Sequence, residues 1–181
     1  ADESAVNLAM SSMSGTLQRA FDRYTSLRGV AGGCLAIVGW EGSKDVVAAR
    51  RRHAHRAFRA FGGVGLGTTV GHSWEKNRFS APYLRDDLLD AGYLVETLET
   101  ANEWSQLQGT YDGVHAALRA TLGEPLIGTH LSHIYPTGAS LYFTVICPLA
   151  DDPVEQWRAA KQAATDALVA SDATITHHHS V

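Results

Sequence analysis

The chain has 181 residues, 45% of them hydrophobic, and a formal net charge of -4 at pH 7. This length fits one domain of ordinary size, or a piece of a larger protein, with enough apolar residues for a buried core. Acidic and basic residues are interspersed, which argues against a general nucleic-acid or membrane-surface role. No apolar run approaches the roughly 20 residues that a membrane-spanning helix needs.

The first half of the chain has mainly helical spacing. A helix is predicted over about residues 15–28, closed by Gly29, and another from Ser43 as N-cap to the glycines at 62 and 63. Between them the short apolar run 35–40 predicts a buried strand. Residues 71–86 mix aromatic and charged groups, which suits either a helical insert that faces a site or a surface helix.

Two other patterns in this half have ordinary alternatives. The basic cluster Arg50–Arg56 lies inside a helical pattern and can be a solvated helix face or an anion-binding patch. The run Gly62–Gly67 follows a helix rather than a strand, so it predicts a flexible turn and not a dinucleotide-binding loop. Cys34 and Cys147 stand in apolar runs without metal-binding spacing, and we expect both to be buried thiols in a reducing compartment.

The second half alternates strands and helices. The pattern predicts strands at 92–100, 126–135 and 139–147, helices at 104–122 and from Asp152-Pro153 onward, and a last strand at 174–176. Residues Pro136–Gly138 are the expected hairpin turn. Taken with the first half, this order predicts an α+β fold, a ferredoxin-like antiparallel sheet with helices on one face plus a helical insert.

Three adjacent histidines, His177, His178 and His179, follow the predicted last strand. Alternation along a strand would send His177 and His179 to one side and His178 to the other. Imidazole changes charge near neutral pH, so this cluster suits the handling of protons or anions. The alternatives are a frayed terminus, the remnant of a tag, or a metal site. No metal site is expected, because neighbouring histidines on a strand cannot all reach one ion.

Four stretches carry a resemblance to a known family. Together and in this order, they resemble the C-terminal half of the alkyldihydroxyacetonephosphate synthase-like FAD-linked oxidases, of the vanillyl-alcohol-oxidase type. The triple histidine is the most specific of the four motifs. The stretches are Pro82–Asp86, Glu96–Ala101 with Trp104, Gly138–Phe143 and Thr174–His179.

The resemblance implies that residues 1–181 are the substrate-binding cap domain of a flavoprotein, without its N-terminal FAD-binding domain. It implies FAD as cofactor of the whole protein and an inactive fragment. The start at Ala1, with no Met, agrees with a fragment. The expected partners are a lipid-like or 2-hydroxy-acid substrate and the missing FAD-binding domain, with no nucleic acid and room for a homodimer. The expected location is cytoplasmic, of bacterial type, with membrane association through a lipid substrate.

The resemblance also implies roles for individual residues. Tyr142 matches the catalytic tyrosine, and His177, His178 and His179 match the catalytic histidine cluster, of which His178 and His179 would also face the cofactor. Arg85 matches an arginine that binds the substrate, since its planar fork suits a carboxylate or phosphate. His130 and His133 would line the same pocket. Each residue has a plainer alternative: Tyr142 as a core residue, and Arg85 as the partner of Asp86 in a surface ion pair.

Three functions follow from this. The first is exchange of the acyl chain of acyl-dihydroxyacetone phosphate for a fatty alcohol, a transferase reaction in ether-lipid synthesis. The second keeps the flavin but makes the protein an oxidoreductase for a 2-hydroxy acid such as lactate or glycolate. The third is a non-catalytic ferredoxin-like interaction module.

Overall fold

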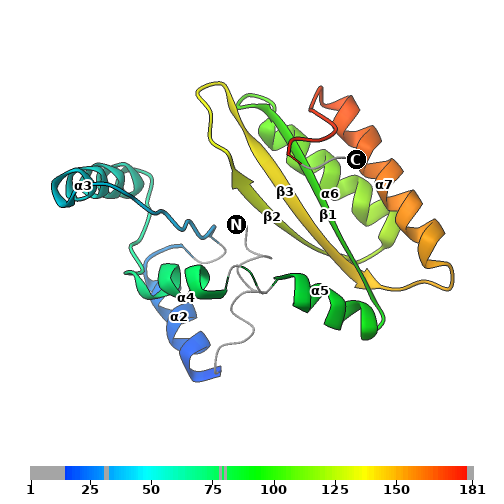
Figure 1. Cartoon of the computed structure of the whole chain (residues 1–181), viewed down its shortest axis with the longest axis horizontal. Helices are drawn as coiled ribbons and strands as arrows, with labels where there is room; N and C mark the ends of the chain where they lie inside the picture. The colour runs from blue at the N-terminus through cyan, green and yellow to red at the C-terminus, as the bar shows by residue number, and fades with distance from the viewer. Residues whose placement is uncertain (1–14, 31–32, 78, 80, 179–181) are drawn as a thin grey trace. The chain divides into compact units, whose positions relative to one another are not determined.

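The computed structural model describes residues 15–30, 33–77, 79 and 81–178. Its contacts divide the chain into two units, one containing Val6–Ala81 and the other Pro82–Val181. In the described residues the first unit holds helices and irregular segments, while the second unit holds the sheet (Figure 1). His179 lies outside the described residues.

The helices of the first unit are α2 (Gly15–Leu27), α3 (Lys44–Ala60) and α4 (Thr69–Asn77), and α5 (Ala81–Asp90) follows them. The two long helices and the helical insert predicted from the sequence are therefore confirmed. The glycine run follows the end of α3, as expected for a turn between helices. No described helix combines the length and apolar character that a membrane crossing requires.

The strand predicted at 35–40 is wrong. Residues 33–40 are irregular, and Ile37 and Val38 are 40% and 43% exposed. A short apolar run carries no information about whether a partner strand is present, and the described residues offer none at this place. Cys34 is exposed too, so its predicted burial is wrong, whereas Cys147 is buried as predicted.

The second unit is built on an antiparallel sheet of three strands, β1 (Tyr93–Glu103), β2 (Leu126–Ser132) and β3 (Gly138–Pro148), in the order β1-β3-β2. Helices α6 (Leu107–Leu122) and α7 (Pro153–Ala170) lie side by side along it (Figure 1). The predicted α+β fold with helices on one face is confirmed. Asp152 caps α7, as the sequence indicated, by accepting a hydrogen bond from the backbone N–H of Glu155 at 3.0 Å.

From Leu141 onward burial alternates along β3, and this shows which face of the sheet the helices cover. Phe143 is 1% exposed and belongs to the same apolar cluster as Val114 and Leu118 of α6 and Ala164 of α7. The preceding residue, Tyr142, points to the opposite face because successive side chains of a strand alternate. The alternate residues of β3 that fill the core are Ala139, Leu141, Phe143 and Val145.

The strand predicted at 174–176 is also wrong, but its position is informative. The segment after α7 is irregular, and Thr174 hydrogen-bonds to the backbone of β1 at the free edge of the sheet. Its N–H donates to the carbonyl of Ala101 at 3.1 Å, and the Ala101 N–H donates to the Thr174 hydroxyl at 2.9 Å. The Thr100 hydroxyl donates to the Thr174 carbonyl. The Thr174 hydroxyl therefore accepts the bond from the Ala101 N–H that a backbone carbonyl would accept in a regular strand pair. No strand pairing continues beyond this residue in the described part of the segment.

The connection between β2 and β3 brings further polar groups to the same end of the sheet. The predicted hairpin is confirmed, although β2 ends at Ser132 and the loop runs over residues 133–137. His133 has a left-handed backbone with φ 45°. Gly138 starts β3 so close to β1 that a Cβ there would lie 2.0 Å from the carbonyl oxygen of Asn102.

Candidate functional site

A row of three polar side chains crosses the face of the sheet that α6 and α7 leave uncovered. In the strand register, Tyr142 on β3 stands opposite Glu99 on β1 and opposite His130 on β2. Directly opposite residues share a face, so the three side chains form one line. The rings of His130 and Tyr142 meet edge to face, with centroids 6.4 Å apart. Two of the predicted site residues, Tyr142 and His130, are thus brought together.

Glu99 is the charged centre of this end of the sheet. Its side chain is only 4% exposed, and a buried carboxylate needs hydrogen-bond donors around it. Its Oε2 accepts from the backbone N–H of His178 at 3.2 Å, and its Oε1 lies 3.4 Å from Nδ1 of His177. Nε2 of His133 is 4.0 Å from the same oxygen. His177, His178 and the loop residue His133 therefore all lie around the Glu99 carboxylate.

The histidines do not alternate as a strand would make them. The rings of His177 and His178 stack on one another, 4.0 Å apart at 16°, instead of pointing to opposite sides. His133 completes the cluster, with its ring 5.1 Å from His177 and 4.2 Å from His178. The alternation was wrong because the segment is not a strand. The role predicted for His179 stays a prediction.

His177 has a second polar neighbour, Tyr135 of the β2–β3 loop. The Tyr135 hydroxyl lies 3.3 Å from Nε2 of His177, on the side of the ring away from Glu99. The sequence reasoning missed both Glu99 and Tyr135. Glu99 could have been noticed as an acid inside a predicted strand, where glutamate is depleted, although Glu96 shares this signal. Nothing local marks Tyr135, because its contact depends on how the loop meets the C-terminal segment.

The structure does not bring Arg85 to this row. Arg85 is exposed on α5, and it forms no hydrogen bond or ion pair with the residues that the structure describes. The predicted alternative, an ion pair with Asp86, is likewise absent from the described contacts. Helix α5 ends before β1 begins, and Glu99 lies six residues beyond Tyr93, about 20 Å along the strand. Substrate binding by Arg85 stays a prediction.

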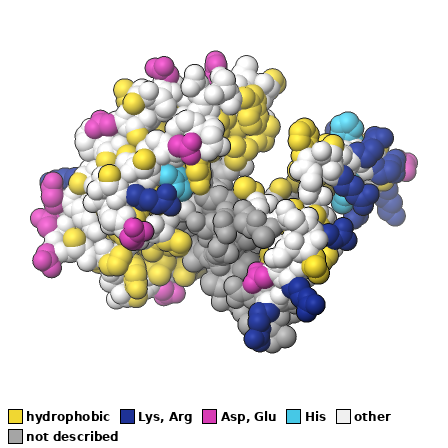
Figure 2. Space-filling model, turned by 180° about the vertical axis from the view of Figure 1, so that it is seen from behind, with side chains coloured by type: hydrophobic (Ala, Val, Ile, Leu, Met, Phe, Trp, Pro, Cys, Tyr) yellow, Lys and Arg dark blue, Asp and Glu magenta, His cyan; other side chains and the backbone are white. Residues whose placement is uncertain are grey.

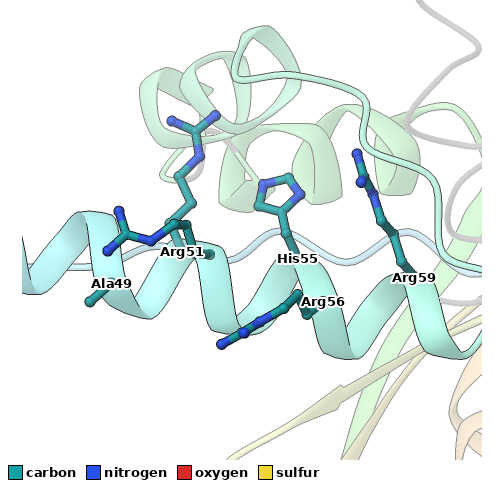
Figure 3. A pocket seen from close by; sticks show the side chains of 6 residues that line it. Ala49, Arg51, His55, Arg56 and Arg59 are labelled. Atoms are coloured by element: carbon teal, nitrogen blue, oxygen red, sulfur yellow. The ribbon is translucent and has the colours of Figure 1, made fainter.

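The basic cluster of the first unit forms a hollow on α3. Ala49, Arg51, Arg52, His55, Arg56 and Arg59 line it, and Figure 3 shows the arginines and His55 reaching off the helix. Basic side chains also gather over this helix in Figure 2. No residue of α3 is buried. Exposure fits both predicted alternatives, a solvated face and an anion-binding patch, so both stay open.

The imidazoles of His133, His177 and His178 also lie close enough together to be considered as ligands of one metal ion. One nitrogen each of His133, His177 and His178 can be chosen so that all lie within 4.8 Å of one another. Nitrogens bound to one tetrahedral zinc ion stand about 3.3 Å apart, given Zn–N bonds near 2.0 Å. The rings would have to turn inward to hold an ion. The expectation of no metal site stays a prediction.

Comparison with known proteins places the chain in a family. A family model for FAD linked oxidases, C-terminal domain, matches residues 2–181. The chain belongs to this family. It is 31% identical over 153 residues to the alkyldihydroxyacetonephosphate synthase of Dictyostelium discoideum and 30% identical over 152 residues to that of Trypanosoma brucei brucei.

Solved structures show the same fold. One crystal form of an alkyldihydroxyacetonephosphate synthase superposes with a TM-score of 0.78 over 97% of this FAD-linked oxidase domain, at 23% identity. Another form gives 0.71 over 96% at 24% identity. The two sequence matches include 81% and 82% of this chain but only 25% of each relative. The chain likewise spans about a third of the solved chains (34% and 33%). The resemblance stated from the four motifs is thereby confirmed.

The FAD-linked oxidase family implies FAD in its full-length members. The uncovered face aligns the Tyr142 phenol with the His130 imidazole, and such groups can hydrogen-bond to the polar edge of a flat ring system. In the described residues no glycine-rich loop leads from a strand into a helix, the arrangement that holds a pyrophosphate. These residues therefore fit the reacting end of such a cofactor and not its phosphate end.

Proposed function

We propose that this chain is the substrate-facing part of an FAD-dependent enzyme that exchanges the acyl chain of acyl-dihydroxyacetone phosphate for a fatty alcohol. The observation that carries the proposal is the row of Glu99, Tyr142 and His130 on the uncovered face of the sheet. Its support from relatives is the match to two alkyldihydroxyacetonephosphate synthases over most of the chain.

The exchange needs a proton to leave and return at the carbon beside a ketone, and a carboxylate to depart. Tyr142 is the proton carrier in this proposal, because a phenol flanked by imidazole can pass a proton in either direction. His130 lies against its ring, and His177 and His178 surround the neighbouring Glu99. FAD, when bound, would supply the electrophilic ring that the protein side chains lack.

Imidazoles on this face serve a second purpose. A departing carboxylate and a phosphate are both anions, and histidine N–H groups can hydrogen-bond to either. His133 and His178 are exposed and therefore open to a ligand. Arg85 is proposed to bind the phosphate only if substrate binding brings α5 to the row, because the described conformation leaves it apart.

The test uses a polypeptide that contains this chain together with an FAD-binding domain of the family. Acyl-dihydroxyacetone phosphate and a long-chain alcohol are added, and fatty-acid release is followed with and without FAD. The proposal expects FAD-dependent release of one fatty acid per alkyl chain incorporated, with no reduction of an acceptor dye. Reduction of the dye by lactate or glycolate, without fatty-acid release, would instead assign a 2-hydroxy-acid oxidoreductase.

A further inference from the structure

Three side chains form a continuous hydrogen-bonded line at the C-terminal end of the chain. Oε1 of Glu99 lies 3.4 Å from Nδ1 of His177, and Nε2 of the same ring lies 3.3 Å from the Tyr135 hydroxyl. The three residues come from β1, from the segment after α7 and from the β2–β3 loop. Each nitrogen of His177 therefore has its own oxygen partner.

Exposure rises along this line. The Glu99 side chain is 4% exposed and that of His177 14%, whereas Tyr135 is 42% exposed. A buried carboxylate at one end and an accessible phenol at the other give the line a direction. The accessible phenol can exchange a proton with a ligand, whereas the Glu99 carboxylate is shielded from solvent.

The carboxylate also decides which nitrogen of His177 carries the proton. An ionised carboxylate only accepts hydrogen bonds, so Nδ1 must donate to it. In a neutral imidazole the other nitrogen is then an acceptor, and Nε2 receives the Tyr135 O–H. This is the arrangement in which an acid orients a histidine that in turn acts on a hydroxyl.

We propose that Glu99, His177 and Tyr135 form a proton relay, in which Glu99 sets the tautomer of His177 and the Tyr135 hydroxyl exchanges the proton with the substrate. Glu99 is a positioning residue in this relay. The inference rests on the proposed function for its substrate, but the geometry of the relay is a property of this chain alone.

The relay transfers protons only, and no residue is oxidised or reduced. A proton leaves the hydroxyl of the attacking fatty alcohol and bonds to the Tyr135 oxygen, while the phenol's own proton passes to Nε2 of His177. The resulting imidazolium is paired with the Glu99 carboxylate, which stays ionised. The reverse shift gives a proton to the departing carboxylate, so Tyr135 and His177 finish as they began, and the proton beside the ketone is left to Tyr142.

The alternative role for the three imidazoles is to bind a divalent cation. An ion held by His133, His177 and His178 would take one His177 nitrogen and so remove either the contact to Glu99 or that to Tyr135. The relay leaves both contacts intact. The two accounts therefore predict different hydrogen positions on the same ring.

The experiment reads those positions by nuclear magnetic resonance on the chain with nitrogen-15-labelled histidine. Spectra are taken at about pH 8.5, where an ordinary imidazole is neutral, and His177 is assigned by its loss in His177→Gln. We expect the Nδ1–H tautomer to exceed the other roughly tenfold, as a hydrogen bond to a charged group provides. Glu99→Gln should reduce this ratio to about twofold or less, because a carboxamide can donate as well as accept.

Two variants make the result specific. Glu103→Gln changes an exposed carboxylate of the same strand and should leave the tautomer ratio unchanged. Tyr135→Phe should keep Nδ1 protonated while moving the Nε2 resonance to that of a nitrogen without a donor. Tyr135 is exposed, so this variant tests the relay even if Glu99→Gln disturbs folding.

Three results would overturn the relay: a His177 that is mainly Nε2–H, a ratio that Glu99→Gln does not change, or an Nε2 resonance that Tyr135→Phe leaves in place. A spectrum that changes on stoichiometric zinc addition and reverts with chelator would assign the cluster to a metal ion instead. None of these results bears on fatty-acid release, so the relay and the proposed function can fail separately.

Discussion

The Glu99 carboxylate and the His177 imidazole lie 3.4 Å apart although 78 residues separate them in the sequence. Their contact depends on Thr174, which fastens the segment after α7 to the edge of β1 two residues from Glu99. The segment is also held where the Ser171 carbonyl accepts from the Asn102 side-chain amide at 2.8 Å, but the anchor nearest the histidines in this edge contact is Thr174. A change at that residue should loosen the cluster without touching any histidine.

Thr174→Val tests this anchor. The substitution keeps the side-chain shape but removes the oxygen that accepts from the Ala101 N–H at 2.9 Å. We expect the free energy of unfolding to fall by about 1–2 kcal/mol, since an amide loses its partner. Hydrogen exchange at Ala101 should accelerate. Thr97→Val, an exposed threonine of the same strand, is the control and should change neither quantity; equal exchange at Ala101 in both variants would refute the anchor.

Gly138→Ala should be strongly destabilising. Its Cβ would lie 2.0 Å from the Asn102 carbonyl oxygen, so β1 and β3 would have to move apart. We expect a loss of about 3 kcal/mol in the free energy of unfolding by denaturant. Gly109→Ala on α6 has open space around it and should stabilise the chain by about 0.5–1 kcal/mol. If Gly138→Ala proves as stable as wild type, the close approach of the two strands is incorrect.

The two cysteines should differ in reactivity. Burial raises the pKa of the Cys147 thiol above its ordinary value of 9.0, and the thiolate is the reactive form. Cys34 is exposed. Iodoacetamide at about pH 8 should therefore modify Cys34 in the folded chain, and Cys147 only after unfolding. Mass spectrometry of the peptides gives the answer, and early labelling of Cys147 would contradict its burial.

The same pKa shift predicts a dependence of stability on pH. Because the folded state holds the Cys147 proton more tightly than the unfolded state, the stabilisation is complete below pH 9.0 and is lost as pH rises through the higher folded pKa. Wild type should thus lose more stability than Cys147→Ala over this alkaline range. Parallel pH curves for the two proteins would rule out the linkage.

Much of the fold followed from local sequence patterns. Helices α6 and α7 repeat apolar residues at helical spacing, and the dipeptide Asp152-Pro153 marks the start of α7 by its residue types alone. Strands β2 and β3 were predictable because a turn separates two β-rich runs. The expected strands at 35–40 and 174–176 failed for a common reason. A short run of apolar or β-branched residues fits a strand, but only a neighbouring strand can make it one.

The candidate site was predictable only in part. Tyr142 and the histidines could be selected from motifs, yet the register that aligns Tyr142 with Glu99 and His130 is set by three strands together. Tyr135 and His177 are 42 residues apart. Contacts of this kind arise from tertiary structure, which no local pattern encodes.

The most direct test of the whole account replaces the phenol at the centre of the row. Tyr142→Phe is compared with Tyr93→Phe, an exposed tyrosine at the start of β1, in a polypeptide that joins this chain to an FAD-binding domain. FAD-dependent fatty-acid release is measured for both. The account predicts a loss of about a hundredfold or more for Tyr142→Phe and an unchanged rate for Tyr93→Phe. Undiminished release by Tyr142→Phe, with flavin bound, would contradict it.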